Sequence, residues 1–248
     1  MKKICVIGLG NMGQAVFDLL KKKKFSVSGF DTTKIVNGGR KNAQIFIIAV
    51  KPQDFEELAE NLKSEIKKNL VISIMAGISI KKIADKLGTK NVVRVMPNLP
   101  LKVGKAFSGW FASKIVSKQD KEFVSKILSS LGEEMEMDSE SQIDAVTAMS
   151  GSGPAYFYFL TELLEKAAGK YGFSKKNAEK IAKATFLGSA FLMDATGFSA
   201  NDLRTKVTSK KGTTEVAINI LSKKNFDKIF FSAVDSAYKR AKRLNKNQ

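Results

Sequence analysis

The chain has 248 residues, 44% of them hydrophobic, so it can bury a core in one large domain or in two smaller ones. It contains no histidine, which excludes a histidine general acid, a Ser-His-Asp triad and the common histidine-based metal sites, and we expect no bound metal. The formal net charge of +18 would suit a nucleic-acid surface, but the lysines are scattered and arginines are few, so we expect a solvated surface and no nucleic-acid partner.

Short apolar runs alternate with amphipathic segments in the first half of the chain. Runs rich in β-branched residues or phenylalanine predict buried strands at residues 4–7, 25–30, 45–50, 70–75 and 92–96. Segments with helical periodicity lie between them at residues 12–20, 53–62 and 80–87. Further strands are predicted at 107–112 and 134–137, with a helix at 117–131 between them. This alternation predicts a parallel, doubly wound α/β sheet.

From residue 141 onward the pattern indicates helices without strands. Long periodic segments lie at residues 154–171, 174–195 and 226–244. The segment 178–194 is apolar over most of its circumference, so we predict that it packs against a partner subunit in a homodimer. We therefore divide the chain into an α/β domain, residues 1–140, and an all-α domain, residues 141–248.

The composition also bears on the compartment. Cys5 is the single cysteine, so no internal disulfide can form, which fits a reducing environment. No stretch approaches the roughly 20 apolar residues that span a bilayer. The apolar run after Lys2 and Lys3 is too short for a secretory signal. We expect a cytoplasmic protein with no membrane part.

A glycine-rich turn, GLGNMG, directly follows the first predicted strand and opens the first predicted helix. In dinucleotide-binding sheets such glycines allow the tight turn, the approach of the pyrophosphate and the packing of helix on strand. The motif is weak in isolation but lies here in the required strand-turn-helix context. The candidate cofactor-binding residues of this turn are Gly8, Leu9, Gly10, Asn11 and Met12.

Asp31 ends the second predicted strand, near where the dinucleotide fingerprint has an acid for the adenosine ribose hydroxyls. A carboxylate at this point favours NADH, because it repels a 2′-phosphate. Thr32, Thr33 and Lys34 follow at once and can hold such a phosphate, and Asp31 can equally be a turn-initiating aspartate. The cofactor is therefore NADPH or NADH, and the choice stays open.

Other candidate cofactor residues lie where later strands end, since open α/β sheets bind ligands at the carboxyl edge. Lys51 can contact the cofactor or be merely the first solvated residue after its strand. Small and backbone-exposing residues at this edge suit a nicotinamide that lies flat. The candidates are Ala49, Val50, Lys51, Ala76, Gly77 and Asn98.

Two polar segments lie in the second half of the chain. The segment SGSGPAY, residues 150–156, is either a flexible hinge before a helix or a ligand loop. The segment VTSKKGTT, residues 207–214, suits a phosphate loop, a carboxylate clamp, a turn or a helix cap formed by Thr208, Thr213 and Thr214. The amides of residues 212–214 precede a periodic segment, and helix starts of this kind bind anions.

The order and spacing of GLGNMG, AVKPQ, RVMPN, SGSGPAY and VTSKKGTT over nearly the whole chain resemble pyrroline-5-carboxylate reductases. The resemblance implies a Rossmann-like N-terminal domain and an interlocked helical C-terminal dimerisation domain. It implies the reduction of 1-pyrroline-5-carboxylate to L-proline by NADPH or NADH, at an active site formed at the dimer interface. Many similar enzymes associate further into larger rings.

The resemblance also implies roles for residues of the second polar segment. Ser209, Gly212 and Thr213 would surround the substrate carboxylate, and Thr214 would bind the ring nitrogen as the catalytic residue. The chain departs from the family in this segment, because Lys210 and Lys211 stand where proline and glycine are usual, and the glycine position can require a positive φ. Ala200 likewise replaces a common proline.

Two alternatives remain beside this interpretation. A β-hydroxyacid dehydrogenase would carry a catalytic lysine one turn into the helix after residue 153, whereas the first lysine here is Lys166. A non-catalytic dinucleotide-sensing or nucleic-acid-binding protein on the same fold is favoured by the positive charge and by Lys210 and Lys211.

Overall fold

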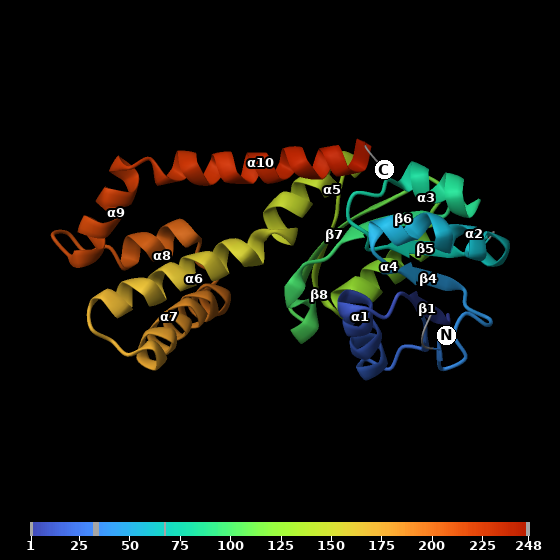
Figure 1. Cartoon of the computed structure of the whole chain (residues 1–248), viewed down its shortest axis with the longest axis horizontal. Coiled ribbons are helices and arrows are strands. Elements are labelled where there is room, and N and C mark those ends of the chain that lie inside the picture. The colour runs from blue at the N-terminus through green and yellow to red at the C-terminus, as the bar shows by residue number, and fades with distance from the viewer. Residues whose placement is uncertain (1, 32–34, 67, 247–248) are drawn as a thin grey trace. The chain divides into compact units, whose positions relative to one another are not determined.

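The computed structural model describes residues 2–31, 35–66 and 68–246. The chain forms two compact units (Figure 1). The sheet unit comprises Met1–Pro154 together with Asp235–Gln248, and the helical unit comprises Ala155–Val234. The domain boundary predicted after residue 140 stays a prediction.

The described residues of the sheet unit form an eight-stranded sheet in the order β3-β2-β1-β4-β5-β6-β7-β8. The strands are β1 (Ile4–Ile7), β2 (Val27–Phe30), β3 (Ile35–Val36), β4 (Ile45–Ile48), β5 (Leu70–Ser73), β6 (Val92–Met96), β7 (Ala106–Ala112) and β8 (Gly132–Glu136). Neighbouring strands run parallel except in the pairs β2/β3 and β6/β7. The doubly wound sheet is confirmed, with two antiparallel pairs that the sequence pattern did not reveal.

Helices cover both faces of the sheet because successive strand residues point to opposite sides. On β1, Ile4 and Val6 join the core beneath α1 (Asn11–Lys22) and α4 (Lys118–Ser129). Cys5 and Ile7 join the core beneath α2 (Phe55–Ile66) and α3 (Ile80–Leu87). Four-residue strands such as β1 and β4 are buried throughout, which explains their continuous apolar runs.

The connection from β2 to β4 is brief. Its described residues, 31 and 35–44, form turns and the two-residue strand β3, and none of them is helical. Gly38 and Gly39 both have positive φ, +79° and +52°, which lets the chain reverse direction there. The strand β3 runs antiparallel to β2 and precedes this glycine turn, so the turn leads from β3 toward β4.

A series of helices follows the sheet. They are α5 (Glu140–Val146), α6 (Gly153–Lys170), α7 (Lys175–Thr196), α8 (Ala200–Lys206), α9 (Thr213–Lys223) and α10 (Phe226–Lys246). A π-helical turn, Thr147–Gly151, follows α5, so the segment SGSGPAY runs from this turn through the bend at Ser152 into the start of α6. Ser152 continues this path in the αR region and donates its N–H to Thr147 O.

Within the sheet unit, a buried ion pair joins α5 and the last part of α10 to β6. Arg94 on β6 is 1% exposed, and its Nη2 lies 2.8 Å from Asp144 Oδ1 on α5. The second oxygen of Asp144 accepts a hydrogen bond of 3.3 Å from Asn245 Nδ2 near the end of α10. Arg94 Nη1 also contacts Glu140 Oε1 at 3.3 Å, and that oxygen accepts the Ile80 N–H at the start of α3. The Arg94 guanidinium therefore contacts α5 directly, and its two carboxylate partners connect it to α10 and α3.

The helical unit leaves large apolar side chains exposed. On α7 only the small residues Ala178 and Ala182 are buried among its described residues, while Phe191 is 66% and Leu192 49% exposed. Phe157 and Phe159 on α6 are also exposed. This chain alone does not bury the apolar circumference of residues 178–194.

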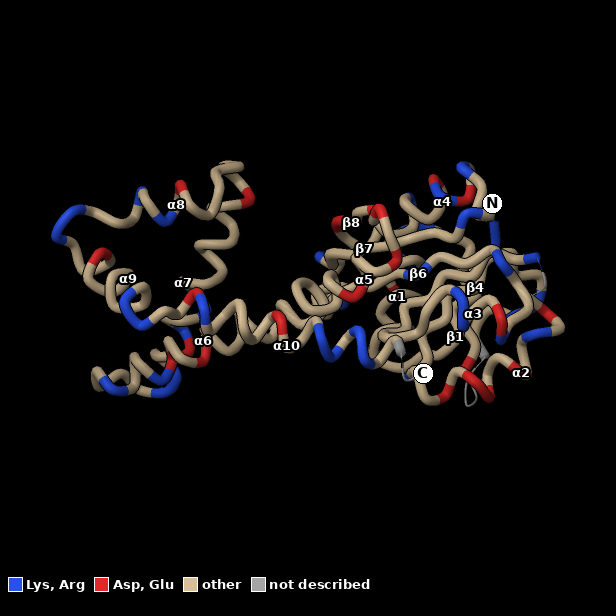
Figure 2. The backbone as a smooth tube through the Cα atoms, turned by 90° about the horizontal axis from the view of Figure 1, so that it is seen from above, with Lys and Arg blue, Asp and Glu red and all other residues tan. Residues whose placement is uncertain are grey.

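Charge and hydropathy add two observations. Lys and Arg are spread over both units, interspersed with Asp and Glu (Figure 2). In the part of the chain that the structure describes, none of the helices has the length and apolar character needed to cross a membrane.

Candidate functional site

The glycine-rich turn between β1 and α1 has the geometry of a phosphate-binding loop. Gly8 has φ +88°, and an added Cβ there would lie 2.9 Å from Val50 N. A Cβ at Gly13 would lie 1.8 Å from Gly8 O, so both positions require glycine. At Gly10 an added Cβ would meet nothing within 4 Å, and this residue caps α1 without a side-chain hydrogen bond. The first amides of α1 are thus open to an anion, which fits a dinucleotide pyrophosphate.

Asp31 lies against this turn. Its Oδ2 accepts a hydrogen bond of 2.6 Å from the Leu9 N–H, so the carboxylate at the end of β2 holds the glycine-rich turn from the side. Asp31 also lines the cavity described next. Thr32, Thr33 and Lys34, the alternative phosphate ligands, lie outside the described residues.

Several predicted cofactor residues meet at one cavity of about 530 Å³ at the carboxyl edge of β1, β2 and β4. These are Gly8, Gly10, Asp31, Ala49, Val50 and Lys51. The cavity is also lined by Phe30, Arg40 and Leu58, which sequence reasoning did not select. The available signal for Arg40 was its rarity: it is one of few arginines and follows a double-glycine turn.

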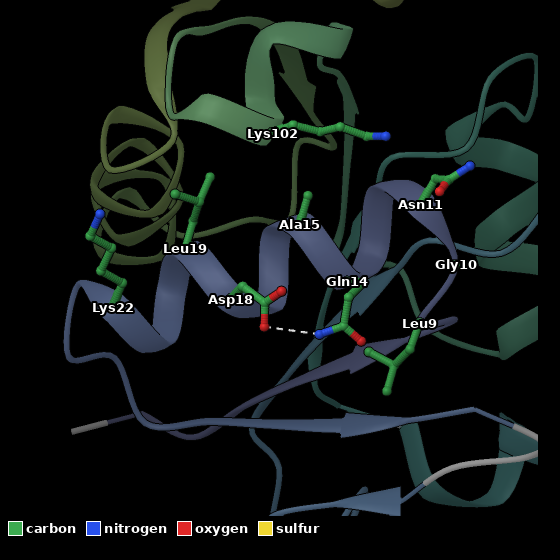
Figure 3. Close-up of a pocket in the computed structure, with 9 residues that line it drawn as sticks. All are labelled: Leu9, Gly10, Asn11, Gln14, Ala15, Asp18, Leu19, Lys22 and Lys102. Atoms are coloured by element: carbon green, nitrogen blue, oxygen red, sulfur yellow. Dashed lines mark hydrogen bonds between the residues drawn. The ribbon is translucent and has the colours of Figure 1, made fainter.

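A second, more open cleft of about 610 Å³ runs along the outer side of α1 (Figure 3). Leu9, Gly10 and Asn11 form one end of it, and Lys102 reaches over it from the turn after β6. Gln14 donates a hydrogen bond of 2.9 Å to Asp18 along its floor. Gly10 borders both spaces, so the backbone of the turn lies between them.

The remaining predicted cofactor residues do not line the 530 Å³ cavity. This holds for Met12, Ala76, Gly77 and Asn98, all of which are described. Ala76 and Gly77 form a turn after β5, and Gly77 has φ +72°. Asn98 follows β6, and both ends of its amide are engaged: Nδ2 donates to Ser150 Oγ at 3.1 Å and Oδ1 accepts from Phe107 N at 2.9 Å. Its observed contacts are structural.

The segment from Ser209 to Thr214 belongs to the helical unit, between α8 and α9. Gly212 caps α9 without a side-chain hydrogen bond, and its own N–H binds Ser209 O at 2.9 Å. An added Cβ at Gly212 would lie 2.4 Å from Ser209 Oγ and 3.0 Å from Ser209 O, so a larger residue there would require Ser209 to move. Thr213 and Thr214 form the first turn of α9, where backbone amides point toward any bound anion.

Lys211 adopts the strained conformation that the sequence comparison suggested. Its φ is +62°, which costs a residue with a Cβ about 1–2 kcal/mol. The Lys211 N–H donates to Glu215 Oε2 at 2.7 Å, a charge-assisted hydrogen bond that opposes this cost. Thr208 does not cap α9; its hydroxyl donates to Arg204 O at 2.6 Å and extends the end of α8.

Two further observations concern reactive side chains. Cys5 is buried in β1, and burial raises the pKa of its thiol to about 11, so it is not a nucleophile near neutral pH. Among the described residues no cluster of three or more His, Cys, Asp or Glu side chains is placed to hold a metal ion.

Comparisons with known proteins agree along the whole chain. Residues 140–244 match the model of the pyrroline-5-carboxylate reductase dimerisation domain, and residues 3–92 match the NAD binding domain of 6-phosphogluconate dehydrogenase. The pyrroline-5-carboxylate reductase of Haemophilus influenzae is 32% identical, covering 98% of this chain and 97% of its own length. That of Aquifex aeolicus is 33% identical with the same coverage of both chains.

Solved structures give the same result. A pyrroline-5-carboxylate reductase from Coxiella burnetii is similar with a TM-score of 0.89 and 34% identity, covering 98% of each chain. The Plasmodium falciparum pyrroline carboxylate reductase, solved with NADP bound, has a TM-score of 0.87 and 28% identity over 98% of each chain.

Proposed function

The chain belongs to the pyrroline-5-carboxylate reductase family, and we propose that it reduces 1-pyrroline-5-carboxylate to L-proline with a hydride from NAD(P)H, the final step of proline biosynthesis. The observation that carries this proposal is identity above 30% over 98% of the chain, which includes both the glycine-rich turn and the segment before α9. In this reaction a hydride adds to the imine carbon, the π electron pair moves to nitrogen, and a proton completes the amine.

The cofactor would bind along the carboxyl edge of the sheet. We infer that the amides at the start of α1, next to Gly10 and Asn11, hold the pyrophosphate, because no side chain caps them. Asp31 and Lys51 line the adjoining cavity from β2 and β4 and would contact the adenosine half. We still propose contacts with the rest of the cofactor for Met12, Ala76, Gly77 and Asn98. When bound, the dihydronicotinamide supplies the hydride.

The start of α9 would hold the substrate. Ser209, Gly212 and Thr213 are proposed to bind the carboxylate, through backbone N–H groups and the serine hydroxyl. The support is local: a Cβ at Gly212 would crowd Ser209, and α9 has no side-chain cap to compete with a bound anion. With the carboxylate bound by backbone N–H groups and a hydroxyl, no arginine is needed.

Thr214 would meet the imine nitrogen. A threonine hydroxyl both donates and accepts hydrogen bonds, so it can orient the imine or pass a proton to the nitrogen. It is a weak acid by itself. A cyclic imine is basic enough to be partly protonated near neutral pH, which makes the absence of histidine compatible with the reaction.

The protein would work as a homodimer through its helical unit. Dimerisation is the property that the matched model of residues 140–244 describes, and the exposed apolar side chains of α6, α7 and α10, such as Phe159, Phe191 and Phe231, are the surface that a second copy would cover. A larger ring and a cytoplasmic location stay predictions. We expect no nucleic-acid partner.

The direct test is oxidation of NADPH and NADH in the presence of 1-pyrroline-5-carboxylate, read as loss of reduced-cofactor absorbance. A folded dimer that binds either cofactor but turns over neither would contradict the assignment and favour a dinucleotide sensor.

Thr214→Ala should lower kcat/KM for the imine roughly 10- to 1,000-fold while cofactor affinity stays nearly unchanged. Thr205→Ala, on exposed α8, is the matched control. If Thr214→Ala lowers folding stability but has no kinetic effect, Thr214 is a helix cap and does not contact the imine.

A further inference from the structure

The short connection between β2 and β4 alters the adenosine side of the cofactor cavity. In a usual dinucleotide-binding sheet a crossover helix and a third parallel strand follow β2. Here the described residues of the connection, 31 and 35–44, contain only turns and the antiparallel strand β3. The 530 Å³ cavity is therefore bordered by the connection itself and by α2, through residues such as Arg40 and Leu58.

Arg40 is held in this cavity from two sides. Its guanidinium carbon lies 4.3 Å from the centre of the Phe30 ring, the last residue of β2. Its Nη1 lies 3.2 Å from Glu65 Oε1 on α2. The side chain is 26% exposed, so it is partly desolvated but still reachable. A guanidinium has five N–H donors, and the Glu65 contact involves only one of its nitrogens.

The charges that line the cavity make Arg40 decisive for an anionic ligand. Asp31, Asp54 and Glu57 contribute carboxylates, and among the described lining residues the only other cation is Lys51. Two cations oppose three carboxylates at this cavity, and without Arg40 only Lys51 would oppose them. With it, a planar fork that suits phosphate geometry is fixed in place. One oxygen of Asp31 is engaged already, because it accepts the Leu9 N–H.

We propose that Arg40 is the residue that selects the cofactor, that its guanidinium binds the 2′-phosphate of the adenosine ribose, and that this chain prefers NADPH to NADH. The proposal rests on the proposed function, because that function is what makes a nicotinamide dinucleotide the expected cofactor. It reverses the choice that Asp31 alone would favour, since an arginine near the acid position is the usual means of accommodating a 2′-phosphate.

The test measures binding of two half-cofactors, adenosine 2′,5′-bisphosphate and adenosine 5′-monophosphate, to the full-length dimer by titration calorimetry. Arg40→Met keeps the apolar stem on Phe30 and removes the charge. We expect this variant to lose roughly 10- to 100-fold in affinity for the bisphosphate and less than about threefold for the monophosphate. KM should then rise for NADPH and stay unchanged for NADH. Lys41→Met, one residue further on an exposed turn, should leave both affinities unchanged.

Equal losses for both nucleotides, or no loss for the bisphosphate, would overturn the proposal. Arg40→Lys, which keeps the charge without the fork, replaces the methionine variant if the latter fails to fold, and should show an intermediate loss for the bisphosphate only. The calorimetric titrations need no imine. A chain that distinguishes the two nucleotides through Arg40 but does not reduce 1-pyrroline-5-carboxylate would uphold this inference and contradict the proposed function.

Discussion

Removing one partner of the buried pair of Arg94 and Asp144 should strongly lower the free energy of unfolding, because the other charge then stays buried without its counter-charge. Arg94 is 1% exposed and the Asp144 side chain 6%, and their closest atoms are 2.8 Å apart. In Arg94→Met the carboxylate of Asp144 stays buried without its counter-charge, and among the described residues only Asn245 remains as a hydrogen-bond donor to its side chain. Breaking such a pair costs about 3–5 kcal/mol, a large part of the roughly 5–15 kcal/mol that typically stabilises a protein.

Urea unfolding at one fixed protein concentration measures this effect, because dimer stability depends on concentration. Trp110 is the only tryptophan, is buried, and pairs with Val95 on β6, so its fluorescence reports directly on this strand. Arg94→Met/Asp144→Asn removes the unpaired charge and should recover at least about 2 kcal/mol of the loss.

The exposed Arg204 provides a matched control, since Arg204→Met should cost less than about 1 kcal/mol. A loss below about 1 kcal/mol for Arg94→Met, or no recovery in the double variant, would refute the reasoning that an isolated buried charge dominates the cost.

Three further outcomes are expected. Gly13→Ala should weaken cofactor binding at least about 100-fold, since its Cβ would lie 1.8 Å from Gly8 O, whereas Gly169→Ala, with nothing within 4 Å, should leave binding unchanged; equal binding by both would contradict the proposed loop geometry. Lys211→Gly should stabilise the protein by up to about 1 kcal/mol in urea unfolding, because relief of the positive φ exceeds the added chain entropy, and a net loss of stability would refute this. Cys5 should resist an aromatic disulfide reagent at pH 8 until the protein is denatured, because burial raises its pKa to about 11; rapid native labelling would contradict that burial.

Sequence reasoning located the elements whose signals are local. The strand of residues 4–7 and the glycine-rich turn after it follow from a continuous apolar run and from glycines at fixed spacing. The helix α8 was missed, although Ser199 and Asp202 form a capping box at its start, because seven residues give too little periodicity to detect. The π-helical turn at residues 147–151 was not predicted, because serines and glycines such as those around Ser150 are typical of loops.

Features that depend on distant contacts were not predictable. Asp31 was selected for a ribose hydroxyl, but its hydrogen bond to Leu9 arises only because β1 and β2 are neighbours in the sheet. Arg40 reaches the cofactor cavity because the connection after β2 is short, and the sequence pattern alone did not distinguish a short connection from an unrecognised helix. Asn98 lies at the predicted edge, yet its amide is engaged by Ser150 and Phe107, which no sequence signal anticipates.

Lys210 and Lys211 change the charge of the segment proposed to bind the substrate more than they change its conformation. Lys211 keeps the left-handed φ that a glycine would adopt without strain, and Glu215 accepts its N–H at 2.7 Å. Gly212, where a Cβ would crowd Ser209, is present, and α9 begins at Thr213 without a side-chain cap. The backbone groups proposed for the carboxylate are therefore still present in this chain. What Lys210 and Lys211 add is positive charge beside an anionic substrate, which should speed its association more than it alters the reaction.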